Sequence, residues 1–192
     1  MRKSRVYIAL LHYPMYNKRM DTITTSITNL DLHDISRAAR TYQVEGFFVV
    51  HPSESQHNLL NDILAYWRQG YGAQYNPDRQ EAFSILKTAA DLDKVITDIE
   101  RETGNKPLTV ATDARIYPQS ISYHRLKNLI FQEEQVLLIL FGTGWGISSE
   151  FIEKCDYILE PVQPGSDYNH LSVRSAVSII LDRLLGEFWF QS

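Results

Sequence analysis

Cysteine is nearly absent from this chain, which has one, Cys155, among 192 residues. A single thiol excludes an intramolecular disulfide and is typical of proteins in a reducing compartment. The sequence has no Cys-x-x-Cys pair, and its six histidines show no His-x-x-x-His spacing. We therefore predict no zinc or other metal site.

Long hydrophobic runs are also missing. The most apolar stretches, residues 6–11 and 136–141, have the length of a strand, far below the roughly 20 residues that cross a bilayer. Basic residues precede the first stretch, but it is shorter than the core of a signal peptide, and no small-residue cleavage site follows it. We expect no membrane segment and a cytoplasmic location.

No large excess of either charge is present, since the formal net charge is −4. This balance excludes a dedicated, non-specific nucleic-acid coat. The charge is unevenly spread, however: residues 1–40 carry +4 and the remainder −8. The amino-terminal part could face an anionic partner, and a solvated face without a partner explains the same charges.

What is present is an ordinary globular composition, with 44% hydrophobic and 22% charged residues and no linker or repeat. Apolar runs of strand length alternate with stretches of helical period, which predicts an α/β fold with a mostly parallel sheet flanked by helices. We expect one domain over residues 1–192. The predicted strands are 5–11, 46–51, 83–88, 108–112 and 136–141; the predicted helices begin at Asn29 or Asp31, at Ser53 in a capping box with Gln56, at Asp91, at Ser120 and at Ser172.

Two features stand out as candidate functional segments. The first is the long polar segment 12–28, because loops of this length in compact domains are usually functional. The second is a glycine loop, residues 142–148, which carries Gly142, Gly144 and Gly146 directly after a buried strand. Ligands in open α/β sheets lie beyond the carboxyl ends of strands, so this loop could hold a cofactor. Ile147 stands where a dinucleotide fingerprint needs glycine, no Gly-Lys-Ser/Thr follows, and a tight structural turn remains an alternative.

Several motifs together resemble one known family. They are Leu-Ile-Leu-Phe-Gly-Thr-Gly-Trp-Gly-Ile-Ser at 138–148, Ile-Leu-Glu-Pro-Val at 158–162 and Asn-His-Leu-Ser-Val-Arg-Ser-Ala at 169–176, with further matches at 12–18 and 28–40. This series resembles the SPOUT superfamily of RNA methyltransferases, in the branch that occurs alone or fused to the bacterial tRNA guanine-N1 methyltransferase. The resemblance covers nearly the whole chain.

The resemblance implies a carboxyl-terminal deep trefoil knot, a homodimer and an enzyme that transfers a methyl group from S-adenosylmethionine to a nucleotide in structured RNA such as tRNA or rRNA. It also implies that three segments hold the cofactor, largely through backbone groups. The cofactor-binding candidates carried over are Leu140, Phe141, Gly142, Thr143, Gly144, Gly146, Ile158, Leu159, Glu160, Pro161, Val162, Asn169, His170, Leu171, Ser172, Val173 and Ala176.

The catalytic candidates are Arg37, Asp31 and Asp167. Arg37 aligns with an arginine that SpoU-type relatives use, but Asp31 stands where those relatives have asparagine, and their glycine-loop glutamate is absent. By analogy with carboxylate-assisted methylation of a base nitrogen, Asp167 or Asp31 would accept the proton and Arg37 would orient RNA. A surface ion pair for Arg37 and a turn cap for Asp167 are the structural alternatives.

Two other functions remain open on these residues. A protein side-chain methyltransferase of the same fold is compatible with the modest net charge, and a non-catalytic RNA- or nucleotide-binding module would explain the missing catalytic residues. The three tryptophans could stack bases, although burial or a dimer contact is the expectation for each, including Trp145 in the glycine loop.

Overall fold

The computed structural model describes residues 2–163, 165 and 168–186. Its centre is a six-stranded sheet in the order β5-β4-β1-β7-β6-β8, and every pair of neighbouring strands is parallel. The predicted α/β class with a mostly parallel sheet is confirmed. The strands are β1 (Arg5–Leu11), β4 (Gly46–Val50), β5 (Leu86–Ala89), β6 (Leu108–Ala111), β7 (Val136–Gly142) and β8 (Tyr157–Ile158).

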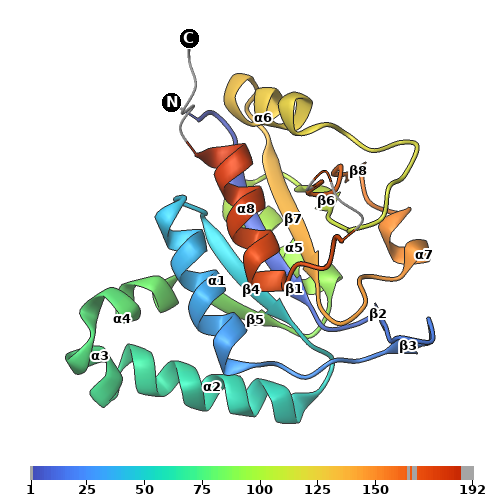
Figure 1. Cartoon of the computed structure of the whole chain (residues 1–192). Helices are drawn as coiled ribbons and strands as arrows, with labels where there is room; N and C mark the ends of the chain where they lie inside the picture. The colour runs from blue at the N-terminus through green and yellow to red at the C-terminus, as the bar shows by residue number, and fades with distance from the viewer. Residues whose placement is uncertain (1, 164, 166–167, 187–192) are drawn as a thin grey trace.

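Helices cover both faces of this sheet (Figure 1). Along β1, Val6, Ile8 and Leu10 belong to one hydrophobic cluster, and the residues between them belong to another, as the two-residue period of a strand requires. The first cluster lies under α1 (Asn29–Thr41), α6 (Tyr123–Gln132) and α8 (Val173–Leu185), and the second lies under α5 (Leu92–Thr103) and the short α7 (Ser149–Ile152). The sheet is therefore buried on both sides, which explains the unbroken apolar runs of β1 and β7.

The register brings the carboxyl ends of the central strands into line. Leu11, the last residue of β1, is paired with Gly142 of β7 on one side and with Val50 of β4 on the other. The segments that follow these strands therefore all begin at the same end of the sheet, where the strands have their carboxyl ends. This end also holds a small antiparallel hairpin, β2 (Met15–Tyr16) and β3 (Thr22–Ile23), inside the long polar segment 12–28.

Between β4 and β5 the chain forms an excursion of three helices, α2 (Glu54–Arg68), α3 (Tyr71–Tyr75) and α4 (Pro77–Ser84). The predicted strand over 83–88 is corrected here, because Phe83 lies in the last turn of a helix on the core and β5 begins at Leu86. The Phe83 side chain can be buried from a helix as well as from a strand. The apolar pattern alone therefore did not distinguish a helix from a strand at this position.

One predicted helix cap and one predicted helix start are wrong, and one predicted capping box does not form. Ser122 rather than Ser120 caps α6, and its hydroxyl accepts from the backbone N–H of Arg125 at 3.3 Å. Thr28 caps α1, since its hydroxyl accepts from the backbone N–H of Asp31 at 3.2 Å. Ser53 precedes α2 without a side-chain capping bond, and Gln56 instead uses Oε1 to accept from the backbone N–H of Ile27 at 2.9 Å. Gln56 therefore stabilises the segment before α1 instead of capping α2. Among the described residues no helix is both long and apolar enough to cross a membrane.

Candidate cofactor and catalytic site

The glycine loop leaves the carboxyl end of β7, and each of its glycines has a structural reason. A Cβ on Gly142 would lie 2.5 Å from Cγ1 of Ile147, so the loop folds back onto a residue without a side chain. Gly144 and Gly146 have φ values of +60° and +95°, which L-residues with side chains rarely adopt. The backbone of the loop is therefore not covered by side chains at these three positions, and a substitution at any of them would change its conformation.

The β2–β3 hairpin clamps this loop. The backbone N–H of Tyr16 donates to the Gly146 carbonyl at 2.9 Å, and the N–H of Trp145 donates to the Tyr16 carbonyl at 3.0 Å. Met15 and Ile147 form an antiparallel bridge beside them. The long polar segment and the glycine loop, which were separate candidates in the sequence, are one structural unit.

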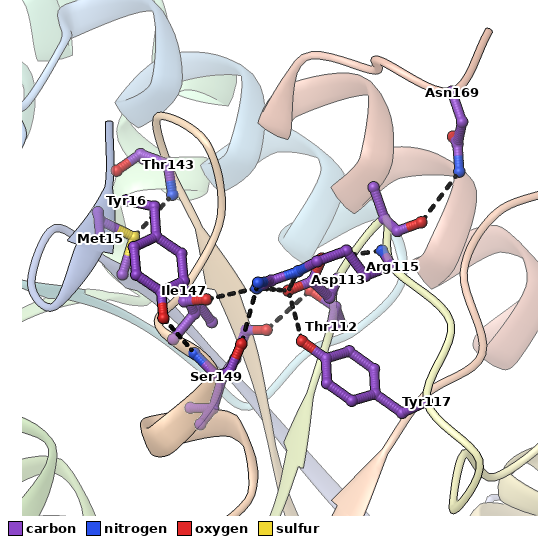
Figure 2. Close-up of polar contacts among 12 residues, drawn as sticks. Met15, Tyr16, Thr112, Asp113, Arg115, Tyr117, Thr143, Ile147, Ser149 and Asn169 are labelled. Carbon is purple, nitrogen blue, oxygen red and sulfur yellow. Dashed lines mark hydrogen bonds and ion pairs between the residues drawn. The ribbon is translucent and has the colours of Figure 1, made fainter. Parts of the chain in front are cut away.

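A charged cluster lies against the other side of the loop, in the turn after β6 (Figure 2). The Arg115 guanidinium donates to both carboxylate oxygens of Asp113, to the Ile147 carbonyl at 2.7 Å and to Ser149 Oγ at 3.1 Å. It lies 5.4 Å from the ring centroid of Tyr16 and 5.8 Å from that of Tyr117. Arg115 thus connects the turn after β6 to the glycine loop and to α7.

The buried carboxylate of Asp113 determines the electrostatics of this cluster. The Asp113 side chain is 4% exposed and also accepts from Tyr117 Oη at 3.3 Å. Hydrogen bonding to Asp113 raises the pKa of Arg115, whereas burial and then the Asp113 charge raise the pKa of the Tyr117 hydroxyl. The guanidinium therefore remains positive beneath the loop.

Sequence reasoning did not single out Asp113, Arg115 or Tyr117. A signal was present, because these polar residues follow directly after the predicted strand 108–112, where ligands of α/β sheets gather. Arg115 contacts residues 16, 147 and 149, which are distant in the sequence. The parallel sheet makes these residues neighbours, so the sequence alone does not show the contacts.

The structure brings two of the three predicted cofactor segments together around this turn. The rings of Trp145 and His170 lie 6.4 Å apart, and the Asn169 side-chain amide donates to the Ala114 carbonyl at 3.4 Å. Leu171 is exposed, whereas Ser172 caps α8 by accepting from the N–H of Ser175 at 3.2 Å. Of the remaining candidates in these segments, Leu140 and Phe141 are buried in β7, Thr143 contacts Met15 and Thr25, and Val173 and Ala176 pack against the core.

The segment 158–162 is held by the chain after β6. The N–H of Leu159 donates to the Ala111 carbonyl at 2.9 Å, and the N–H of Glu160 donates to the Ile121 carbonyl at 3.0 Å. Glu160 also accepts from the N–H of Tyr123 at 2.8 Å. Ile158, Leu159 and Pro161 are buried and Val162 is half-buried, so this segment lies in the apolar interior at the carboxyl end of β6.

The three predicted catalytic residues are not brought together within the described part of the chain. Asp31 is 5% exposed and accepts from the Thr28 hydroxyl at 2.6 Å and from Arg174 Nη1 at 2.7 Å. Arg37 is exposed on α1, where no ion pair is formed with it by the residues that the structure describes, so the surface salt bridge expected as its alternative is absent there. Asp167 lies outside the described residues. Within residues 2–163, 165 and 168–186, no group of three or more histidine, cysteine, aspartate or glutamate side chains is placed to hold a metal ion.

Arg37 lies between two surface hollows, each of about 720 Å³. One is formed by α1 and α4. The other is formed by α1 and α8 and includes Ser172, which follows the 169–170 segment beside the glycine loop. The first contains Arg2 and Arg40, which pair with Glu45 and Glu81.

His12 is a fully buried titratable group at the same edge of the sheet. Its Nδ1 lies 3.0 Å from Thr25 Oγ1, which lies 2.5 Å from Thr143 Oγ1 of the glycine loop. Its Nε2 has no hydrogen-bond partner among the residues that the structure describes. Burial, and then the neighbouring His51, lower the pKa of His12 from 6.5 to about 4.

This shift predicts a specific loss of stability in acid. In the unfolded chain His12 takes up a proton near pH 6.5, whereas the folded chain resists it until about pH 4. The free energy of unfolding should therefore fall as pH drops through this window, by about 3 kcal/mol from His12 alone. Urea unfolding of His12→Gln should show a correspondingly shallower acid dependence than the original chain. The exposed His124→Gln should leave the dependence unchanged, and a His12→Gln curve parallel to the original would contradict the assignment.

Comparison with known proteins identifies the family. A model described as SAM-dependent RNA methyltransferase matches residues 5–186. An uncharacterized protein of Aquifex aeolicus is 46% identical over 186 residues, which is 97% of this chain and 91% of that protein. The tRNA (guanine-N(1)-)-methyltransferase of Nitratidesulfovibrio vulgaris is 44% identical over 186 residues, which is 95% of this chain but 42% of that protein.

Solved structures agree on the fold. The SpoU methyltransferase AviRb from Streptomyces viridochromogenes superposes with a TM-score of 0.56 at 17% identity, covering 94% of this chain and 58% of that one. An AdoMet-bound rRNA methyltransferase from Sinorhizobium meliloti gives 0.57 at 15% identity, covering 94% and 55%. The resemblance inferred from the sequence motifs is confirmed: this chain belongs to the family of S-adenosylmethionine-dependent RNA methyltransferases.

Proposed function

We propose that this chain transfers a methyl group from S-adenosylmethionine to a nucleotide of structured RNA, either tRNA or rRNA. Family membership supports the reaction class. The observation that carries the site assignment is the glycine loop, whose bare backbone lies at the carboxyl end of β7 and contacts the 169–170 segment through the rings of Trp145 and His170. The chain spans less than half the length of the tRNA methyltransferases that it matches, so its own substrate is part of the proposal.

The residues present fit this cofactor. Glycines at 142, 144 and 146 let backbone amides and carbonyls approach an adenosine edge, while buried Ile158, Leu159 and Pro161 supply an apolar wall for a flat ring. We propose the full set of candidates in segments 140–146, 158–162 and 169–176 as the cofactor pocket. The rRNA methyltransferase with bound AdoMet shares the fold, which supports this placement.

When bound, the cofactor supplies an electrophilic methyl group on a sulfonium. The protein's task is then to align the target atom with that methyl group and to accept a proton where the target carries one. Arg115 fixes the loop through the Ile147 carbonyl, and exposed Arg37 is proposed to orient an RNA phosphate. Both Asp31 oxygens are already engaged, by Thr28 and by Arg174, so we propose Asp167 as the proton acceptor.

Four further features are proposed for this chain. After β8 at the edge of the sheet, α8 packs on α1 and α6, and this return from the edge strand supports the knot that the sequence motifs imply. We propose this knot, and a single domain over residues 1–192. We also propose a homodimer through the exposed hollow between α1 and α8, and a cytoplasmic location, where RNA substrates and a reduced Cys155 are expected.

The proposed reaction is tested by methyl transfer. The purified chain is incubated with methyl-labelled S-adenosylmethionine and separate tRNA and rRNA transcripts. We expect label to enter an RNA. Label in added protein instead, or none from a preparation that binds the cofactor, would refute the proposal.

A further inference from the structure

Trp145 is displayed to solvent rather than buried. The residue is 54% exposed in the single chain, which corrects the expectation of burial and leaves the alternative expectation, a dimer contact, as a prediction. Its backbone is nevertheless fixed, because its N–H donates to the Tyr16 carbonyl and it lies between the left-handed Gly144 and Gly146. The glycine loop thus holds an indole outward at the edge of the proposed cofactor site.

Trp145 is part of an exposed aromatic cluster. Its ring lies 6.4 Å from His170 at an angle of 64°, and His170 lies 5.2 Å from Tyr168 at 73°. All three side chains are exposed. They come from two loops more than twenty residues apart in sequence, so the fold presents several ring surfaces in one place.

Two cations follow the point where the hairpin meets this loop. The N–H of Trp145 donates to the Tyr16 carbonyl, and the turn of the β2–β3 hairpin, which begins directly after Tyr16, carries Lys18 and Arg19. Both side chains are exposed, and neither pairs with an acidic group among the described residues. The same turn carries one carboxylate, Asp21, which accepts from the Asn17 amide at 3.0 Å. The hairpin tip, Lys18 and Arg19, therefore leaves the turn with a net charge of +1 on a chain of net charge −4.

An exposed aromatic ring on a loop joined to a hairpin with two exposed cations fits a nucleic-acid strand that has an unpaired base. Proteins that bind such strands combine cations along the backbone with aromatic rings on which bases stack. We propose that Trp145 stacks an unpaired base of the RNA substrate while the hairpin tip binds the adjoining phosphates. This inference rests on the proposed function, and it assigns the substrate-recognition surface to the hairpin and the glycine loop.

The test is binding of a fluorescently labelled RNA hairpin with an unpaired loop, compared with a fully paired duplex of the same stem. Trp145→Ala should weaken binding of the hairpin RNA by roughly 5- to 150-fold and leave duplex binding within about 2-fold, because only an unpaired base can stack. Trp145→Phe, which keeps a ring, should retain most of the affinity. An unchanged affinity of Trp145→Ala for the hairpin RNA would overturn the proposal.

The cations are tested by the dependence of RNA affinity on salt. Neutralising both in Lys18→Gln/Arg19→Gln should reduce the slope of log affinity against log salt by about 1.5, from two lost phosphate contacts. Lys18→Gln alone should act in the same direction, whereas Lys106→Gln should not, because Lys106 is also exposed but lies before β6, at the amino ends of the strands. Equal slopes for Lys18→Gln and Lys106→Gln would contradict the assignment.

S-adenosylmethionine titrations on the same preparations separate this inference from the proposed function. In Trp145→Ala we expect the loss of affinity for the hairpin RNA to exceed any loss of affinity for the cofactor. Loss of cofactor binding with RNA binding intact would show that the indole stacks on the cofactor's adenine, and would overturn the inference. Failure of the original chain to bind cofactor would refute the proposed function, and the RNA measurements would still decide the role of Trp145.

Discussion

Replacing Arg115 by methionine is expected to lower the free energy of unfolding by about 3 kcal/mol. The substitution leaves the Asp113 carboxylate, 4% exposed, without its counter-ion, with only the Tyr117 hydroxyl and the backbone N–H of residue 115 as donors. It also removes the donor that holds the Ile147 carbonyl, so affinity for S-adenosylmethionine should fall by about 10-fold. Urea unfolding near neutral pH and calorimetric titration measure the two effects.

A matched control is Arg101→Met. Arg101 is 76% exposed and pairs with Asp98 on the surface of α5, so its loss should cost less than about 1 kcal/mol. If Arg115→Met unfolds at the same urea concentration as Arg101→Met, the charged cluster does not support the glycine loop.

Asp31→Ala should cost about 3 kcal/mol for a related reason. Asp31 is buried and joins α1 to α8 through Arg174, and its removal leaves that guanidinium without its closest acceptor. Asp34→Ala is the matched control, because Asp34 contacts the same arginine at 3.4 Å but is half exposed, and it should cost less than about 1 kcal/mol.

Methyl transfer by these two variants distinguishes structure from catalysis. At a temperature where Asp31→Ala remains folded, we expect transfer within about 10-fold of the original chain, since Asp31 acts by joining two helices. A variant with unchanged stability and no transfer would instead make Asp31 the proton acceptor, as the sequence alignment allowed.

The sequence was sufficient to predict the elements whose signal is local. The run of β7 is apolar at every position because both faces are buried, and the stripe of α8 repeats at three and four because one face lies on the core. The family motifs are likewise contiguous stretches of residues, so the resemblance is visible in the amino-acid sequence alone.

The parts that could not be predicted depend on residues distant in sequence. The two-residue strands β2 and β3 are fixed by bonds to the glycine loop, such as Tyr16 to Gly146, and have no pattern of their own. The role of Arg115 exists only because residues 16, 113 and 147 meet around it. The exposure of Trp145 follows from the left-handed glycines beside it rather than from its own hydrophobicity.

The central claim is that the glycine loop holds the cofactor, and calorimetric titration of S-adenosylmethionine into the original chain, Gly144→Val and Gly104→Val tests it most directly. Both glycines have left-handed backbone, at φ +60° and +77°, but Gly144 lies in the loop and Gly104 ends α5 in open space. We predict that the original chain and Gly104→Val bind alike, and that Gly144→Val loses on the order of 100-fold or more in affinity. Equal binding by both variants, or no binding by the original chain, would contradict the claim.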